Sequence, residues 1–236
     1  MITATPPFAL PRLNAANKER YLHYAMQILE AQKHMLGEDG KNLLHYLLKN
    51  RERYERMTHY PQGDRIDSVS GAQYFYHCHR ENFASTEHGH FHCFLRYKNI
   101  PTSIKPSALK DWDYYIENPM THIIAIAMNQ MGQPIRLFTV NRWVTSEIWY
   151  DASNMSKIIK NYQLNLTHSY WSVLDHWVEG IIHLFTPQIT WLHRQRDRYM
   201  QHQIDSGNVN PYTDRSLEEL SELSIDLKKQ IEWVIQ

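Results

Sequence analysis

The chain has 236 residues, enough to bury one substantial core, and we expect a single domain over residues 1–236. Lysine plus arginine and aspartate plus glutamate number 25 each, so the formal net charge is zero, which argues against nucleic acid or an anionic membrane surface as a partner. No membrane-length apolar run and no disulfide framework from Cys78 and Cys93 are found, so we expect a cytoplasmic protein.

The first part of the chain is expected to be an extended arm followed by two helices. Three prolines within residues 1–14 disfavour helix there. Within residues 15–58, Leu22, Ala25, Met26 and Leu29 recur at helical spacing, and a second leucine stripe follows after Gly37 and Gly40. We therefore predict a helical hairpin over residues 15–58.

Residues 60–150 are predicted to form a histidine-rich sheet. Tyr60 to Asp64 has the composition of a turn, and the pattern after it alternates with a period of two. The predicted strands are 72–79, 90–97, 122–129 and 135–141. Because most connections are too short for parallel crossovers, we predict a mostly antiparallel sheet of about four or more strands.

Residues 151–236 are predicted to be C-terminal helices packed on this sheet. An apolar stripe from Trp171 to Phe185 gives the clearest helix, and a more polar helix over 188–204 follows. Ser216 and Glu219 have capping-box spacing before leucines that repeat every three or four residues. This last helix is expected to dock on its own domain or to support a homodimer. The predicted fold class is α+β.

The histidines provide the strongest functional signal. Five of them lie between residues 77 and 92: His77, His79, His88, His90 and His92. Alternate residues of a strand share a face, so both groups converge if the two strands pair as a hairpin. Such imidazoles, with Glu87 or the distant His122, suit a divalent metal ion such as Zn, Fe or Mn. The alternatives are a metal-free catalytic or binding site and a purely structural cluster.

The opposite face of these strands is predicted to be apolar. Tyr74, Tyr76, Phe91 and Leu95 alternate with the histidines, and both cysteines fall on the same side as these residues. A buried free cysteine behaves as a small hydrophobic residue. We therefore interpret Cys78 and Cys93 as core residues and not as metal ligands.

Further candidates follow the last predicted strand. Arg142 could orient a carboxylate or phosphate, with Asn141 and Trp143 as additional substrate-binding residues. Glu87 or Glu147 could act as a general base. The alternative for this segment is a structural pair between Arg142 and Glu147, with the tryptophans in the core.

Two resemblances concern the histidine motifs. The combination of His77-Cys78-His79, the segment 87–92 (EHGHFH) and the segment 141–145 (NRWVT) resembles an uncharacterised bacterial family of unknown function, over about residues 60–152. That resemblance implies a shared site but no reaction. Residues 88–94 also resemble the histidine-triad signature, which implies His90 as the nucleophile on a nucleotide phosphate. The sequence departs from that signature at Gly89, where an apolar residue is usual. Cupins also carry H-x-H on strands, but they need more strands than are predicted here.

These features favour a metal-dependent enzyme, of hydrolase or oxygenase type, that acts on a small polar or anionic molecule. A non-catalytic protein that binds a small ligand is the alternative from another class. A metal-free nucleotide hydrolase of histidine-triad type is the second alternative.

Overall fold

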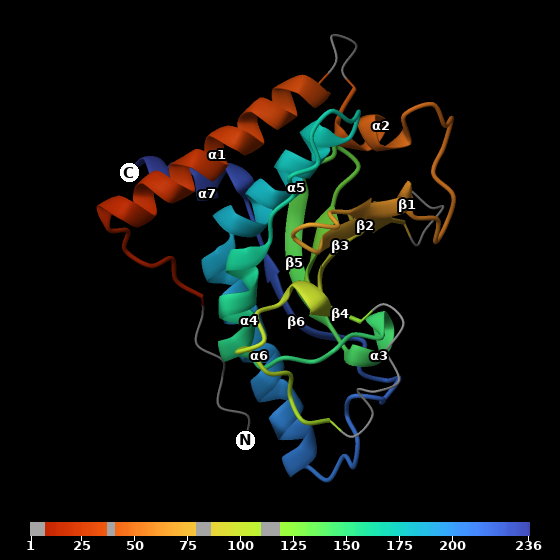
Figure 1. The fold of residues 1–236 in the computed structure, drawn as a ribbon, viewed down its shortest axis with the longest axis vertical. Coiled ribbons are helices and arrows are strands. Elements are labelled where there is room, and N and C mark those ends of the chain that lie inside the picture. The colour runs from red at the N-terminus through yellow and green to blue at the C-terminus, as the bar shows by residue number, and fades with distance from the viewer. Residues whose placement is uncertain (1–7, 37–40, 79–85, 110–118) are drawn as a thin grey trace.

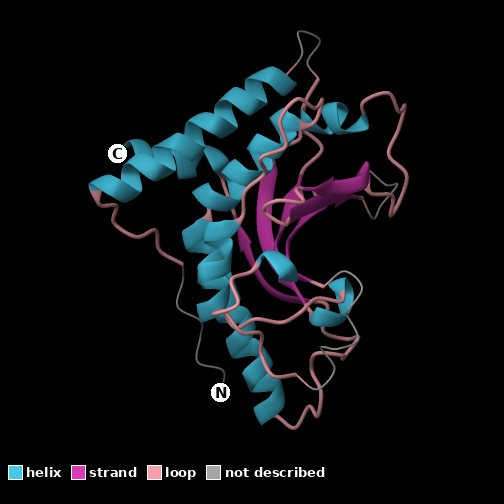
Figure 2. Cartoon of the chain, in the orientation of Figure 1, coloured by secondary structure: helices cyan, strands magenta, loops and turns pink. Residues whose placement is uncertain are grey.

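The computed structural model describes residues 8–36, 41–78, 86–109 and 119–236. A six-stranded antiparallel sheet lies at its centre, with strands in the order β1-β2-β3-β4-β5-β6. The long helices gather on one side of this sheet (Figures 1 and 2). The α+β prediction, with an antiparallel sheet and flanking N-terminal and C-terminal helices, is confirmed.

Along the described residues, the chain forms six strands, seven α-helices and two short 3-10 helices. The strands are β1 (Tyr60–Ile66), β2 (Ala72–His77), β3 (Gly89–Arg96), β4 (Met120–Met128), β5 (Pro134–Val140) and β6 (Glu219–Ser224). The α-helices are α1 (Ala15–Met35), α2 (Leu43–Leu48), α3 (Arg142–Thr145), α4 (Ala152–Ile158), α5 (Ser172–Leu184), α6 (Thr186–Asp205) and α7 (Leu227–Ile235). Two short 3-10 helices are η1 (Tyr97–Asn99) and η3 (Ile159–Asn161). The predicted N-terminal hairpin is thus one long helix followed by a short one.

The two faces of the sheet differ in chemistry because successive side chains of a strand point to opposite sides. Tyr74 and Tyr76 of β2, with Phe91 and Cys93 of β3, belong to the main hydrophobic core on the helix side. Phe91 lies 5.7 Å from Trp177 of α5, measured between ring centroids. The predicted apolar face is therefore confirmed, and Cys93 is a core residue.

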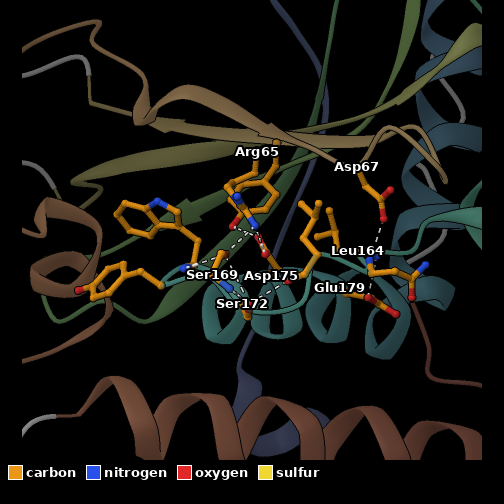
Figure 3. Close-up of polar contacts among 12 residues, drawn as sticks. Arg65, Asp67, Leu164, Ser169, Ser172, Asp175 and Glu179 are labelled. Atoms are coloured by element: carbon orange, nitrogen blue, oxygen red, sulfur yellow. Dashed lines mark hydrogen bonds and ion pairs between the residues drawn. The ribbon is translucent and has the colours of Figure 1, made fainter.

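A buried ion pair fixes the edge of the sheet to α5. Arg65 of β1 donates from Nε to Oδ1 of Asp175 at 3.0 Å and from Nη2 to Oδ2 of the same carboxylate. Tyr74 of β2 donates its hydroxyl to Asp175 Oδ1 at 2.7 Å. Figure 3 shows Arg65 reaching from the strand to Asp175, which is fully buried. A buried carboxylate is tolerated when its oxygens are paired in this way.

Two sequence predictions about element type are wrong. The segment from Tyr60 to Asp64 is not a turn but the beginning of β1, where Pro61 and Gly63 are accommodated because β1 is an edge strand with an irregular register. The predicted final helix from residue 216 is interrupted, since residues 219–224 form β6 beside β5 and α7 begins only at Leu227. The domain segment 151–236 is therefore not purely helical.

A membrane-spanning helix was not expected from the sequence. Among the helices of the described ranges, none combines the length and the apolar composition that a bilayer crossing requires.

Candidate functional site

Three buried histidines meet on the sheet face opposite the long helices. β2 pairs with β3 in a register that places His77 opposite His90 and Phe75 opposite His92. One ring nitrogen from each of His77, His90 and His92 lies within 4.8 Å of the others. The Nε2 atoms of His77 and His90 are 2.9 Å apart. The predicted convergence of the two H-x-H groups is therefore found for these three residues.

Small residues around the histidines allow this close arrangement. Ala127 of β4 lies opposite His90, and its short side chain lets the ring of His90 approach Phe138 of β5 to 5.1 Å between centroids. At Gly89, an added Cβ would lie 2.4 Å from the carbonyl oxygen of His77 and 2.7 Å from the hydroxyl of Tyr76. Glycine is thus required at this position for the close approach of β2 and β3.

A carboxylate holds the second nitrogen of His90. Oε1 of Glu87 lies 2.8 Å from His90 Nδ1, and Oε2 accepts from Arg136 Nη2 at 2.9 Å. Burial acts to raise the pKa of Glu87, but the hydrogen bonds from His90 and Arg136 outweigh it, and the pKa is lowered. Glu87 therefore stays ionised and can fix the orientation of the His90 ring.

A fourth histidine holds His92 in the same way. Nε2 of His122 lies 3.0 Å from Nδ1 of His92. Complete burial lowers the pKa of His122 to about 3, with smaller contributions from Arg196 and His90. The His122 ring is therefore neutral and can accept the N–H of His92. His122, predicted as a metal ligand, lies outside the three-histidine group and contacts His92.

Glu147 lies behind His122 and outside the pocket. Its Oε2 accepts from the backbone N–H of His122 at 2.8 Å and from the hydroxyl of Thr121 at 3.2 Å. Burial raises the pKa of Glu147 to about 7, although Arg196 and these hydrogen bonds oppose the rise. Because Glu147 does not line the pocket, it is not placed to contact a substrate there, as the predicted general base would have to do.

Two of the three predicted substrate-binding residues are buried and bonded to backbone carbonyl groups. Asn141 is buried and donates from Nδ2 to the carbonyl oxygens of Pro211 and Leu217. Arg142 is 2% exposed and donates from Nε to the carbonyl oxygen of Glu147 at 3.2 Å. Trp143 lines the pocket, with Nε1 donating to Leu217. Of these three residues, Trp143 is the one that lines the described pocket.

A second described histidine of the predicted metal group, His88, is also outside the three-histidine group. His79 lies outside the described residues. β3 begins at Gly89, so His88 precedes the strand, and its Nδ1 lies 2.6 Å from the hydroxyl of Tyr76 on the helix side. His88 lines the pocket, but its Nδ1 is hydrogen-bonded to the hydroxyl of Tyr76, a core residue.

The pocket over the histidines contains one further histidine that the sequence reasoning missed. The His59 ring stacks on Phe75 at 3.6 Å between centroids, and its Nδ1 lies 2.8 Å from Oδ1 of Asp64. His59 precedes β1, the strand that was predicted as a turn. No spacing pattern could have linked it to the cluster, because its position depends on how the edge strand folds back onto β2.

The pocket itself has a volume of about 830 Å³ and combines aromatic, apolar and charged walls. Its described lining is Met57, His59, Phe75, His77, Glu87, His88, Gly89, His90, His92, Phe94, Met120, Arg136, Phe138, Val140, Trp143, Val144, Thr145, Glu218 and Glu219. A concave, mostly apolar site with a few convergent polar groups is typical of small-molecule binding.

The donor set suits a metal ion. Zn–N bonds of about 2.0–2.1 Å in a tetrahedron require nitrogen atoms roughly 3.3 Å apart. This spacing lies between the 2.9 Å that separates Nε2 of His77 from Nε2 of His90 and the 4.8 Å limit of the group. Metal-binding histidines usually donate their other ring N–H to a carboxylate or another acceptor. His90 and His92 have such partners in Glu87 and His122. The buried cluster could therefore hold a metal ion.

Comparison with known proteins adds a family but no activity. Residues 22–225 match a family described as domain of unknown function (DUF6969). A search of curated proteins and a search of solved structures found no match.

Proposed function

Since the chain belongs to this family of unknown function, we propose its function from the site alone: a metal-dependent enzyme of hydrolase or oxygenase type. The observation that carries the proposal is the buried group of His77, His90 and His92, with the remaining nitrogens of His90 and His92 held by Glu87 and His122. Divalent zinc, iron or manganese would fit three imidazole ligands.

Three protein ligands favour a catalytic over a structural site. Structural zinc sites usually have four protein ligands, whereas catalytic sites have three and leave a position open. A metal ion here would supply an activated water or a binding position for an oxygen-containing group. The pocket above the histidines would hold the substrate, and its aromatic walls would limit access of water.

Each residue of the site then has a role that its contacts support. His77, His90 and His92 would bind the metal ion. Glu87 would orient His90, and His122 would orient His92. Arg142, buried and bonded to the backbone of Glu147, is not part of this proposal.

The test is elemental analysis of protein purified without an affinity tag. We expect about one metal ion per chain, absent from a variant with both His90→Ala and His92→Ala, since the remaining ligand alone binds weakly. The matched control changes the exposed His23 and His202 to alanine and should keep the metal. Metal-loaded protein would then be screened for hydrolysis and for oxygen consumption.

Either of two results would contradict the proposal. Metal-free protein after purification and reconstitution would favour the alternative of a metal-free ligand-binding protein. Activity that resists chelators but is lost in His90→Ala would favour a histidine nucleophile of the histidine-triad kind.

A further inference from the structure

Arg136 is the only lysine or arginine among the described residues that line the pocket, and its guanidinium is bonded to carboxylates. Its Nη2 donates to Glu87 at 2.9 Å and to Glu219 at 3.2 Å. Its Nη1 donates to Glu222 at 2.8 Å and also to Glu219. The guanidinium carbon lies 4.1 Å from the ring centroid of Phe138. Arg136 therefore has little capacity left to bind an anionic substrate.

The carboxylates that line the pocket outnumber its lysine and arginine side chains. Glu87, Glu218 and Glu219 line it, and Glu222 contacts Arg136 at its edge. The three lining carboxylates outweigh Arg136, so before a metal ion binds, and with neutral histidines, the lining carries a net negative charge. An anion entering the pocket would meet net repulsion, and a cation net attraction, in surroundings where partial burial strengthens both effects.

The remaining walls suit an apolar body attached to that cation. Phe75, Phe94, Met120 and Val144 line the pocket beside the histidines. Phe75 and Phe94 face each other with ring centroids 5.8 Å apart, which gives a continuous aromatic wall. Aromatic faces bind apolar groups by burial and attract ammonium groups through their quadrupoles.

We propose that the pocket takes an organic ammonium compound, with the ammonium group beside the carboxylates of β6 and the apolar body on the aromatic wall. This inference names the substrate class for the site of the proposed function, and so rests on that function. The sequence analysis expected a small polar or anionic substrate, and this inference replaces the anionic alternative, which depended on Arg142.

The test uses three probes that share one ring and differ in charge: benzylamine, benzyl alcohol and benzoate. Binding is measured by titration calorimetry on metal-free protein, because benzoate could otherwise coordinate the metal ion. We expect benzylamine to bind at least about tenfold more tightly than benzoate, with benzyl alcohol between them. Raising the ionic strength from about 0.01 M to about 1 M, which shortens the Debye length from roughly 30 Å to 3 Å, should weaken benzylamine alone.

Substitutions in β6 test whether its carboxylates cause the preference for the ammonium probe. Glu219→Gln and Glu222→Gln should each weaken benzylamine severalfold and leave benzyl alcohol unchanged, because only the charged probe depends on these carboxylates. Glu232→Gln, at an exposed position of α7, is the control and should change neither.

Benzoate binding as tightly as benzylamine, no binding of benzylamine at millimolar concentration, or an unaltered benzylamine affinity in both β6 variants would overturn the inference. These outcomes are separate from those for the metal site. Protein that binds no metal but prefers benzylamine would refute the proposed function and keep the ammonium pocket. Protein that binds metal without this preference would do the reverse.

Discussion

Glu87 is the residue that joins the histidine cluster to the charged edge of the pocket. One oxygen contacts His90 and the other contacts Arg136. A carboxylate in this position fixes the ring orientation of a metal-binding histidine and increases its basicity. Metal affinity should therefore depend on the charge of Glu87, although Glu87 does not itself belong to the buried three-histidine group.

We predict that Glu87→Gln lowers the metal affinity by about 10–100-fold and leaves the fold intact. Glutamine has nearly the same shape and can still accept a hydrogen bond from His90, so the loss reports the missing charge. A competition titration with a chromogenic chelator measures the affinity. Glu52→Gln, at an exposed position, is the control. Equal affinities in Glu87→Gln and wild-type protein would show that Glu87 does not support the metal ion.

The sequence predicted part of this site correctly for a physical reason. Alternation along β2 and β3 is a local property, so it was enough to place His77, His90 and His92 on one face. It could not distinguish Arg142 from Arg136. Arg142 lies two residues after the end of β5, where the chain enters α3, and its side chain is buried in the protein.

At the scale of elements, the packing of α1 on α5 depends on Gly180. A Cβ added at Gly180 would lie 2.6 Å from Cγ1 of Ile28, well inside contact distance. Ile28 is fully buried, so it has no free space into which it could move. The two helices can approach closely only because position 180 carries no side chain.

We predict that Gly180→Ala lowers the free energy of unfolding by about 1–3 kcal/mol through overpacking, despite the better helix propensity of alanine. Ile28→Ala removes the clashing atom but leaves a cavity. The double variant should therefore be more stable than the sum of the single effects implies, by about 0.5–3 kcal/mol. Urea denaturation of the four proteins measures this coupling, and additive effects would mean that Gly180→Ala does not act through a clash with Ile28.

The same scale explains why β6 was missed. Leu217, Leu220 and Leu223 are spaced by three residues and continue to Leu227, which satisfies a helical repeat. The strand forms because Glu219–Ser224 pairs with β5, about eighty residues earlier in the chain. Local periodicity contains no information about such a partner. The helix resumes only where Asp226 accepts from the backbone N–H of Lys229 at 3.1 Å.

This division of the leucine stripe also affects the expected homodimer. The stripe was expected to form one apolar face of a single helix. In the structure it is shared between a strand and α7, and Val234 of α7 is buried within the chain. A homodimer through the C-terminal helix stays a prediction. The single apolar helix face on which it was based is divided between β6 and α7.

At the scale of the whole molecule, one face of the sheet packs the hydrophobic core and the other carries the proposed site. The helix side carries the main core and the Arg65–Asp175 pair, whereas the other side carries the histidines and the pocket. Glu147 and His122 lie between the pocket and the interior, both completely buried. Because burial changes their pKa values on folding, the free energy of unfolding depends on pH.

We predict that wild-type protein loses stability relative to Glu147→Gln as the pH rises from about 4.5 to about 7. The pKa of Glu147 is raised from 4.5 to about 7 by burial. In this window the unfolded chain releases the proton while the folded chain keeps it, so unfolding becomes more favourable in the wild type alone. At about 1.4 kcal/mol for each pKa unit, the relative change is up to about 3 kcal/mol.

The lowered pKa of His122 acts in the opposite direction, since its contribution to stability is lost as the pH falls below its ordinary value of 6.5. His122 is present in both proteins, so its effect cancels in the difference. Urea denaturation of the metal-free proteins at several pH values across the window measures that difference. Glu55→Gln, whose side chain is 65% exposed, should show no such dependence. A difference between Glu147→Gln and wild type that does not change with pH would mean that Glu147 is ionised throughout, with Arg196 and the His122 amide compensating its burial.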